Sequence, residues 1–209
     1  MNRDRILYFV VSAASLGLIT TANFLGGRAL PACLADLCIP SLVVCACLYA
    51  GSRPARPLAP PWPTTPGRRV VRLAGVWLAL WWLASAVAAV IVGHWIRYTS
   101  GACAIVCFVV LGPLQEELLF RGALYEWAER AWPTPGRWGP VAATTVPFAL
   151  QHFQFHGYRL SGAALLQVAF TVPMGIVFAR LRQDSGSVWP GWVVHVLTNL
   201  PGAFGSGAI

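Results

Sequence analysis

Long runs of apolar residues, separated by short polar segments, extend along the whole chain. Several of these runs reach the roughly 20 residues that an α-helix needs to cross a bilayer core about 30 Å thick. The pattern predicts seven membrane-spanning helices, at residues 6–26, 30–50, 70–96, 101–128, 140–155, 163–181 and 188–200. The last is short, because Pro201 should stop or kink it. We therefore expect an all-α, polytopic transmembrane helical bundle.

The composition supports this fold class. Of the 209 residues, 57% are hydrophobic and only 11% are charged, which is too apolar for an ordinary soluble domain. We expect residues 1–209 to form a single integral-membrane domain with no separate soluble part.

The net charge of +8 could suggest a nucleic-acid partner, but the positions of the charges favour another explanation. All fifteen basic residues are arginines, and a cytoplasmic N-terminus would put eleven of them on the cytoplasmic side and three outside. This is the asymmetry of the positive-inside rule. It predicts a multi-pass cell-membrane protein that has a cytoplasmic N-terminus and contacts the lipid bilayer, not nucleic acid.

Three of the predicted spans also carry polar and ionisable side chains. Such groups are expensive at membrane depth, so they usually face a wet cavity and act in chemistry or transport there. Two carboxylates, two imidazoles and an amide are a plausible set for hydrolysis. The residues are Glu116, Glu117 and Arg121 in the fourth span, His152 in the fifth, and His195 and Asn199 in the seventh.

The two adjacent glutamates are expected to have different roles. Consecutive residues are about 100° apart on an α-helix, so Glu116 and Glu117 should not share one environment. Glu117 and Arg121 are four apart and lie on the same face, which predicts an ion pair. Glu116 would then face the cavity as a general base. A polar cluster that only fixes helix packing is the alternative.

The other polar residues each allow two interpretations. His152 follows Pro147, which should kink the fifth span, but a lone histidine near a span end is also common at the membrane interface. His195 and Asn199 are four apart and emerge on one face, so together they could donate hydrogen bonds to an oxyanion. A pair at this spacing could equally hold two helices together.

The depths of these residues favour the catalytic interpretation. With a rise of 1.5 Å per residue, Glu116, His152 and His195 lie about 18, 20 and 14 Å from the cytoplasmic ends of their spans. The three helices alternate in direction, yet the three groups fall in one layer. Residues placed only for local packing have no reason to agree in this way.

The segments EELLFR, FALQH and HVLTN, at residues 116–121, 148–152 and 195–199, resemble the motifs EExxxR, FxxxH and HxxxN of the CPBP intramembrane glutamic endopeptidases. That family includes the type II CAAX prenyl endopeptidases and the bacterial Abi proteins. The resemblance covers about residues 100–200 and implies a catalytic core there. It implies that Glu116 and His152 activate water, that His195 and Asn199 stabilise the oxyanion, and that Glu117 and Arg121 support the site.

We therefore expect an intramembrane endopeptidase that hydrolyses a peptide bond of a membrane-associated protein or peptide with a Glu/His-activated water, without a cofactor or metal ion. A zinc peptidase is the nearest alternative, because Glu and His bind zinc, but the HExxH motif is absent. A non-catalytic membrane factor of the Abi type, such as a bacteriocin immunity protein or an assembly partner, is the alternative from another class.

Overall fold

The computed structural model describes residues 6, 10, 39–52, 67–93, 96–97, 105–132, 138–204 and 207–208. The predicted first span at residues 6–26 therefore lies almost entirely outside the described residues. The other six predicted spans each contain described helix.

The described elements are nearly all helical, which confirms the all-α expectation. The first two described helices are α3 (Ile39–Ser52) and α4 (Arg68–Val92). One continuous helical segment over residues 105–131 contains η2 (Cys107–Leu111), α6 (Gly112–Glu116), η3 (Glu117–Leu124) and α7 (Tyr125–Ala131). The remaining helices are α8 (Trp138–Gln151), η5 (His152–His156), α9 (Gly162–Ser185) and α10 (Trp189–Phe204).

Two short strands complete the described elements. Strand β1 (Ile96–Arg97) pairs in parallel with β2 (Gly207–Ala208), in the register that places Ile96 opposite Gly207. The strand pair joins the chain after α4 to the chain after α10.

The ends of α9 show how local sequence sets the helix boundaries. The Ser161 hydroxyl accepts a hydrogen bond from the Ala164 backbone N–H at 3.2 Å, so it satisfies one of the unpaired donors of the first turn. The helix ends at Gly186, whose φ of 70° is readily adopted only by a residue without a side chain. These two signals bound the helix at both ends.

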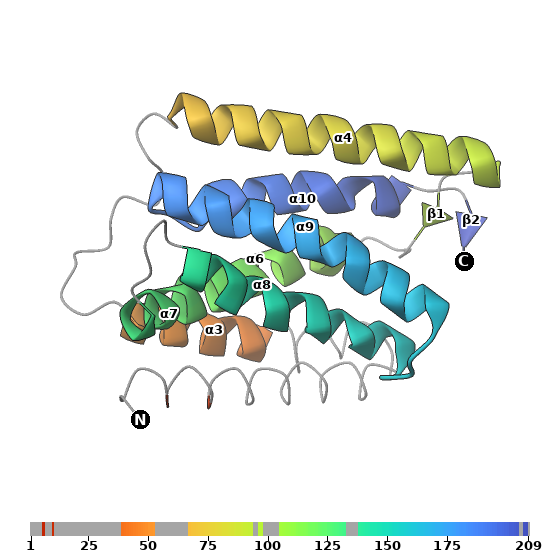
Figure 1. The fold of residues 1–209 in the computed structure, drawn as a ribbon. Coiled ribbons are helices and arrows are strands. Elements are labelled where there is room, and N and C mark those ends of the chain that lie inside the picture. The colour runs from red at the N-terminus through yellow and green to blue at the C-terminus, as the bar shows by residue number, and fades with distance from the viewer. Residues whose placement is uncertain are drawn as a thin grey trace.

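The helices pack so that the residue 105–131 segment lies inside the bundle (Figure 1). Helix α4 runs along α10 on one side, and α3 lies on the opposite side, next to α7. Segment η3 packs against α3, α8, α9 and α10, and all eight of its residues are buried. The carboxylate doublet, at the junction of α6 and η3, is thus held at the centre of the bundle.

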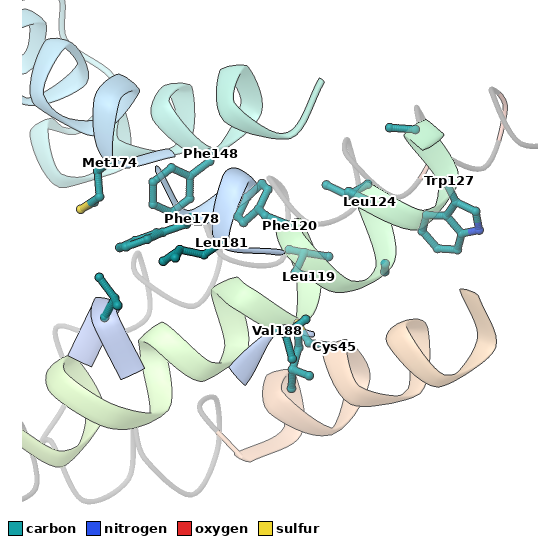
Figure 2. Close-up of a cluster of buried hydrophobic side chains, with 14 of the residues drawn as sticks. Cys45, Leu119, Phe120, Leu124, Trp127, Phe148, Met174, Phe178, Leu181 and Val188 are labelled. Atoms are coloured by element: carbon teal, nitrogen blue, oxygen red, sulfur yellow. The ribbon is translucent and has the colours of Figure 1, made fainter. Parts of the chain in front are cut away.

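A cluster of buried apolar side chains surrounds that junction (Figure 2). Phe148 lies in its aromatic part, with ring centroids 5.5 Å from Phe120 and 6.4 Å from Phe178, both in edge-on geometry. Edge-on pairs of this kind stabilise more than their buried area alone. These three phenylalanines join η3, α8 and α9.

Segments η2 and η3 are π-helical, whereas an ordinary α-helix was expected over residues 101–128. A π-helical turn holds an extra residue and is rare, and it often occurs at functional sites. Here one π-helical segment begins at Glu117 and includes Arg121. The unusual backbone therefore coincides with the EELLFR motif.

Among the described residues, two helical stretches are long and apolar enough to cross a membrane, Arg68–Ile91 and Gly162–Ser185. Their outward faces carry many exposed apolar side chains, including Leu83 and Val90 on α4 and Leu166 and Phe170 on α9. Exposed apolar surface of this extent is typical of contact with a membrane. The count of seven spans stays a prediction.

Helix α10 extends beyond residue 200, where the sequence predicted the end of the last span. It does not stop at Pro201 but continues through that residue to Phe204. The proline leaves the Leu197 carbonyl without its helical donor. The indole N–H of Trp82 on α4 bonds this carbonyl instead.

Candidate active site

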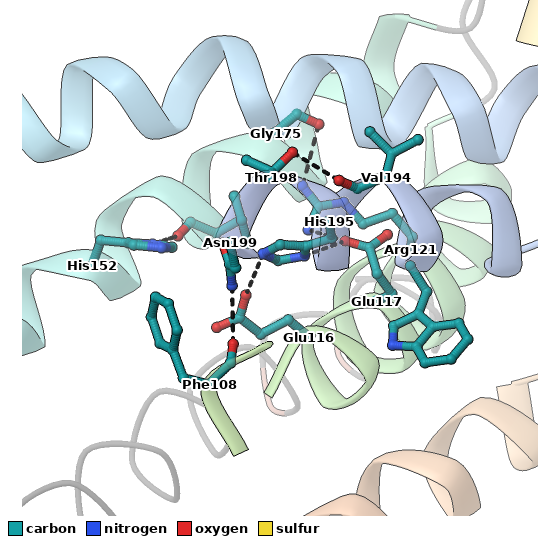
Figure 3. A network of polar contacts seen from close by, with 12 residues as sticks. Phe108, Glu116, Glu117, Arg121, His152, Gly175, Val194, His195, Thr198 and Asn199 are labelled. Carbon is teal, nitrogen blue, oxygen red and sulfur yellow. Dashed lines mark hydrogen bonds and ion pairs between the residues drawn. The ribbon is translucent and has the colours of Figure 1, made fainter. Parts of the chain in front are cut away.

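Glu117 is fully buried, and its carboxylate contacts the Arg121 guanidinium and the His195 imidazole (Figure 3). Its Oε1 lies 3.4 Å from Nη1 of Arg121 and 3.3 Å from Nδ1 of His195. The ion pair that the four-residue spacing predicted is therefore present. Because a carboxylate only accepts hydrogen bonds, the contact with His195 requires the imidazole to carry its proton on Nδ1.

The other oxygen of Glu117 faces the start of α10. A Cβ atom at Gly191 would lie only 2.6 Å from Oε2 of Glu117, so the carboxylate can approach this turn only because residue 191 has no side chain. The N-terminal end of a helix carries a partial positive charge, which favours a carboxylate there. Gly191 lies outside the three sequence motifs, so the motifs did not indicate that it borders the site.

Glu116 is more accessible than its neighbour, with about 17% of its side chain exposed against 0% for Glu117. Its Oε2 lies 3.7 Å from Nε2 of His195. The two glutamates therefore differ in exposure, as expected, and both also approach the His195 ring, Glu117 at Nδ1 and Glu116 at Nε2. The wider turn that begins at Glu117 rotates consecutive side chains by less than an α-helix does.

Arg121 is buried in an aromatic surrounding. Its guanidinium carbon lies 4.0 Å from the ring centroid of Phe148 and 5.3 Å from that of Phe178. Its Nη2 donates to the Gly175 carbonyl at 3.2 Å. Ring faces and a carbonyl stabilise a cation that water cannot reach. Arg121 is thus positioned to neutralise Glu117 inside the bundle.

His152 stands at the first position of η5, where the chain narrows from an α-helical to a 3₁₀ turn. Its Nδ1 donates to the Phe148 carbonyl at 2.8 Å, and its ring meets the Phe148 ring edge-on at 5.0 Å. The same Phe148 ring lies 4.0 Å from the guanidinium carbon of Arg121. His152 thus belongs to the same group of residues.

Phe148 links the two histidines. The His195 ring lies 6.1 Å from the Phe148 centroid, on a helix different from that of His152. Phe148 is the first residue of the FxxxH motif, but the motif alone did not indicate a function for its side chain. In the structure the Phe148 ring meets both imidazoles in edge-on geometry and lies against the Arg121 guanidinium.

Asn199 is one helical turn after His195 on α10. Its side-chain amide donates a hydrogen bond to the Phe108 carbonyl in η2 at 3.1 Å. The spacing of HVLTN alone did not predict this partner. One amide hydrogen therefore holds α10 against η2, and an amide carries a second hydrogen for another acceptor.

Arg182 makes a further contact with the backbone of η3, which the sequence did not predict. Nε of Arg182 donates to the Arg121 carbonyl at 2.9 Å, and its Nη2 contacts the Glu126 carboxylate. From the sequence, Arg182 is one of the eleven arginines expected on the cytoplasmic side. In the structure it ties the end of α9 to the π-helical segment that carries Arg121.

His, Cys, Asp and Glu side chains are the usual protein ligands of metal ions. Within the described part of the chain, no group of three or more His, Cys, Asp and Glu side chains is arranged to hold a metal ion. The polar groups at the site form a row of contacts that runs from Glu116 through His195 and Glu117 to Arg121, as Figure 3 shows.

Residues 98–201 match the family described as type II CAAX prenyl endopeptidase Rce1-like. The matched region contains EELLFR, FALQH and HVLTN and begins after α4. No curated protein and no solved structure matches the chain.

Proposed function

Because the chain belongs, through residues 98–201, to the Rce1-like family of type II CAAX prenyl endopeptidases, we propose that it is an intramembrane endopeptidase of the glutamic type. It hydrolyses a peptide bond of a membrane-associated protein or peptide. One observation carries the proposal: Glu116 is partly exposed beside His195, whereas Glu117 is sealed and ion-paired. Of the two carboxylates, only Glu116 is accessible to a water molecule and a substrate.

In the proposed reaction, Glu116 takes a proton from water, with His152 holding that water on its other side. The oxygen of the water adds to the scissile carbonyl carbon and forms a tetrahedral oxyanion. When the C–N bond breaks, the amide nitrogen receives the proton from Glu116. The products are an amine and a carboxylic acid, which releases its proton to water to become a carboxylate, and no covalent enzyme intermediate forms.

His195 and Asn199 are proposed to stabilise the oxyanion. The bond from Nδ1 of His195 to Glu117 turns Nε2 toward Glu116 and the reacting carbonyl. Because Nδ1 already carries a proton, Nε2 donates to the oxyanion when the imidazole is protonated on both nitrogens. The second amide hydrogen of Asn199 is the other donor, while the first bonds Phe108.

Glu117 and Arg121 are proposed as supporting residues. Their buried pair fixes the Nδ1 side of His195, so the imidazole cannot rotate when charge develops on the substrate. Donors that are held in place before the reaction stabilise a transition state without reorganisation.

The orientation follows from the arginine asymmetry, and we propose a multi-pass protein with its N-terminus in the cytoplasm. A reporter inserted after Arg56 should then be active only in the cytoplasm, and one inserted at Arg159 only outside. A phosphatase and a fluorescent reporter at both positions measure this. The opposite pattern would invert the orientation.

The function is tested by comparing the membrane peptides of three cell populations. One population lacks the protein, one expresses the parent chain, and one expresses Glu116→Ala. We expect at least one membrane peptide to be cut only in cells with the parent chain. If Glu116→Ala cells match the parent, the role of the protein is non-catalytic, as an immunity factor or assembly partner would require.

A further inference from the structure

Pro201 creates a defect in the helix that carries His195 and Asn199. A proline has no backbone N–H, so the carbonyl four residues earlier, that of Leu197, loses its helical partner. Helix α10 nevertheless continues to Phe204. Prolines are tolerated in membrane helices where neighbouring groups satisfy the freed backbone atoms. The Leu197 carbonyl therefore needs a hydrogen-bond donor from outside its own helix.

Three tryptophans on α4 supply the donors. The indole N–H of Trp82 bonds the Leu197 carbonyl at 3.2 Å, and that of Trp81 bonds the Thr198 carbonyl at 2.7 Å. The indole N–H of Trp77 bonds the Thr198 hydroxyl at 3.1 Å. All three donors thus converge on two consecutive residues.

The Thr198 hydroxyl is held in one orientation by two hydrogen bonds. Its hydroxyl donates to the Val194 carbonyl at 2.7 Å while it accepts from Trp77. A hydroxyl has one hydrogen, so these two bonds determine its orientation. The rings of Trp77 and Trp81 also stack, with centroids 5.6 Å apart. The contacts therefore restrict both the rotation and the translation of α10 relative to α4.

The bonded residues lie within the catalytic motif. Leu197 and Thr198 stand between His195 and Asn199 on the same helix. A small rotation at this turn would move both side chains relative to Glu116. Helix α4, which supplies the three indoles, lies before the residues that match the family.

We propose that Trp77, Trp81 and Trp82 are positioning residues, and we call them the tryptophan clamp. The clamp holds the HVLTN turn of α10 at the rotation and depth that point His195 and Asn199 at the substrate carbonyl. Trp82 does so by replacing the hydrogen bond that Pro201 removes. This inference rests on the proposed function, and it assigns a catalytic requirement to a helix outside the matched region.

The kinetic test uses Trp→Phe variants, which keep the ring and remove the donor. The substrate is the peptide found in the membrane comparison, made with a fluorophore and quencher around its cleavage site. Small displacements of catalytic groups cost up to about 10²-fold in rate. We expect Trp81→Phe and Trp82→Phe each to lower kcat by at least about tenfold, with KM within about twofold. Unchanged kcat in all three variants, or a rise in KM alone, would overturn the proposal.

Replacing Pro201 gives a matched rescue experiment. Pro201→Ala restores an N–H for the Leu197 carbonyl, so the donor of Trp82 becomes redundant. We expect Trp82→Phe to have almost no effect on kcat in the Pro201→Ala background. Trp77→Phe acts on the Thr198 hydroxyl, so its effect should persist there. An equal loss from Trp82→Phe in both backgrounds would overturn the role of Pro201.

A spectroscopic readout separates failure of the clamp from failure of the peptidase proposal. In ¹⁵N-tryptophan-labelled full-length protein in micelles, the three clamp indole protons should exchange with deuterium far more slowly than that of Trp138, which is 55% exposed. Equally fast exchange would overturn the clamp, whatever the activity. Slow exchange in a protein that cleaves no peptide would support the clamp as a packing device and overturn its catalytic role.

Discussion

Glu116→Gln should abolish peptide cleavage while the protein still folds. Removing a general base typically costs about 10²–10⁴-fold in rate. Glu116 is partly exposed and its ion-pair contact with His195 is long, at 3.7 Å, so an isosteric amide should leave the packing unchanged. Single-turnover cleavage of the quenched peptide by reconstituted protein measures the loss, and the yield of folded protein measures stability.

Glu117→Gln is the matched control, because it makes the same chemical change at the adjacent residue. An amide oxygen can still accept from Nδ1 of His195, so we expect a loss of no more than about tenfold. If Glu117→Gln is inactive while Glu116→Gln keeps its rate, the roles of the two carboxylates are reversed. A chelator should leave the parent rate unchanged, and inhibition that zinc restores would favour a metallopeptidase.

Arg121→Ala should destabilise the fold more than any other single change at the site. Breaking a buried ion pair by removing one partner costs about 3–5 kcal/mol, because the remaining charge is left uncompensated. Glu117 would be that charge, since neither side chain of the pair is exposed. Denaturant or SDS titration of the purified protein measures the free energy of unfolding.

Arg69 gives the control for this prediction. It pairs with Asp184 at 3.0 Å, but its side chain is 77% exposed. Exposed pairs contribute about 0–1 kcal/mol, so Arg69→Ala should change the unfolding free energy little. The double variant Arg121→Ala/Glu117→Gln should recover part of the loss. Equal effects of Arg121→Ala and Arg69→Ala would show that the buried pair does not support the fold.

The sequence predicted some site features correctly because they depend on local geometry. The Glu117–Arg121 pair follows from a four-residue separation on a helix, and the structure contains it. The depth estimate placed Glu116, His152 and His195 in one layer, and of these Glu116 and His195 are in contact. The sequence did not predict that both glutamates contact His195, because periodicity assumes an α-helix and the chain changes to a π-helix at Glu117.

The sequence by itself determined the all-α fold class and the family, and it indicated the residues that we propose bear the chemistry, because hydrophobic period and motif spacing are properties of short segments. Only the tertiary structure decided which partners those residues have. Phe148 beside His195, Gly191 against Glu117, and the α4 indoles on Leu197 and Thr198 join residues from 47 to 117 positions apart. No periodic pattern encodes such contacts, because they depend on how whole helices pack against one another.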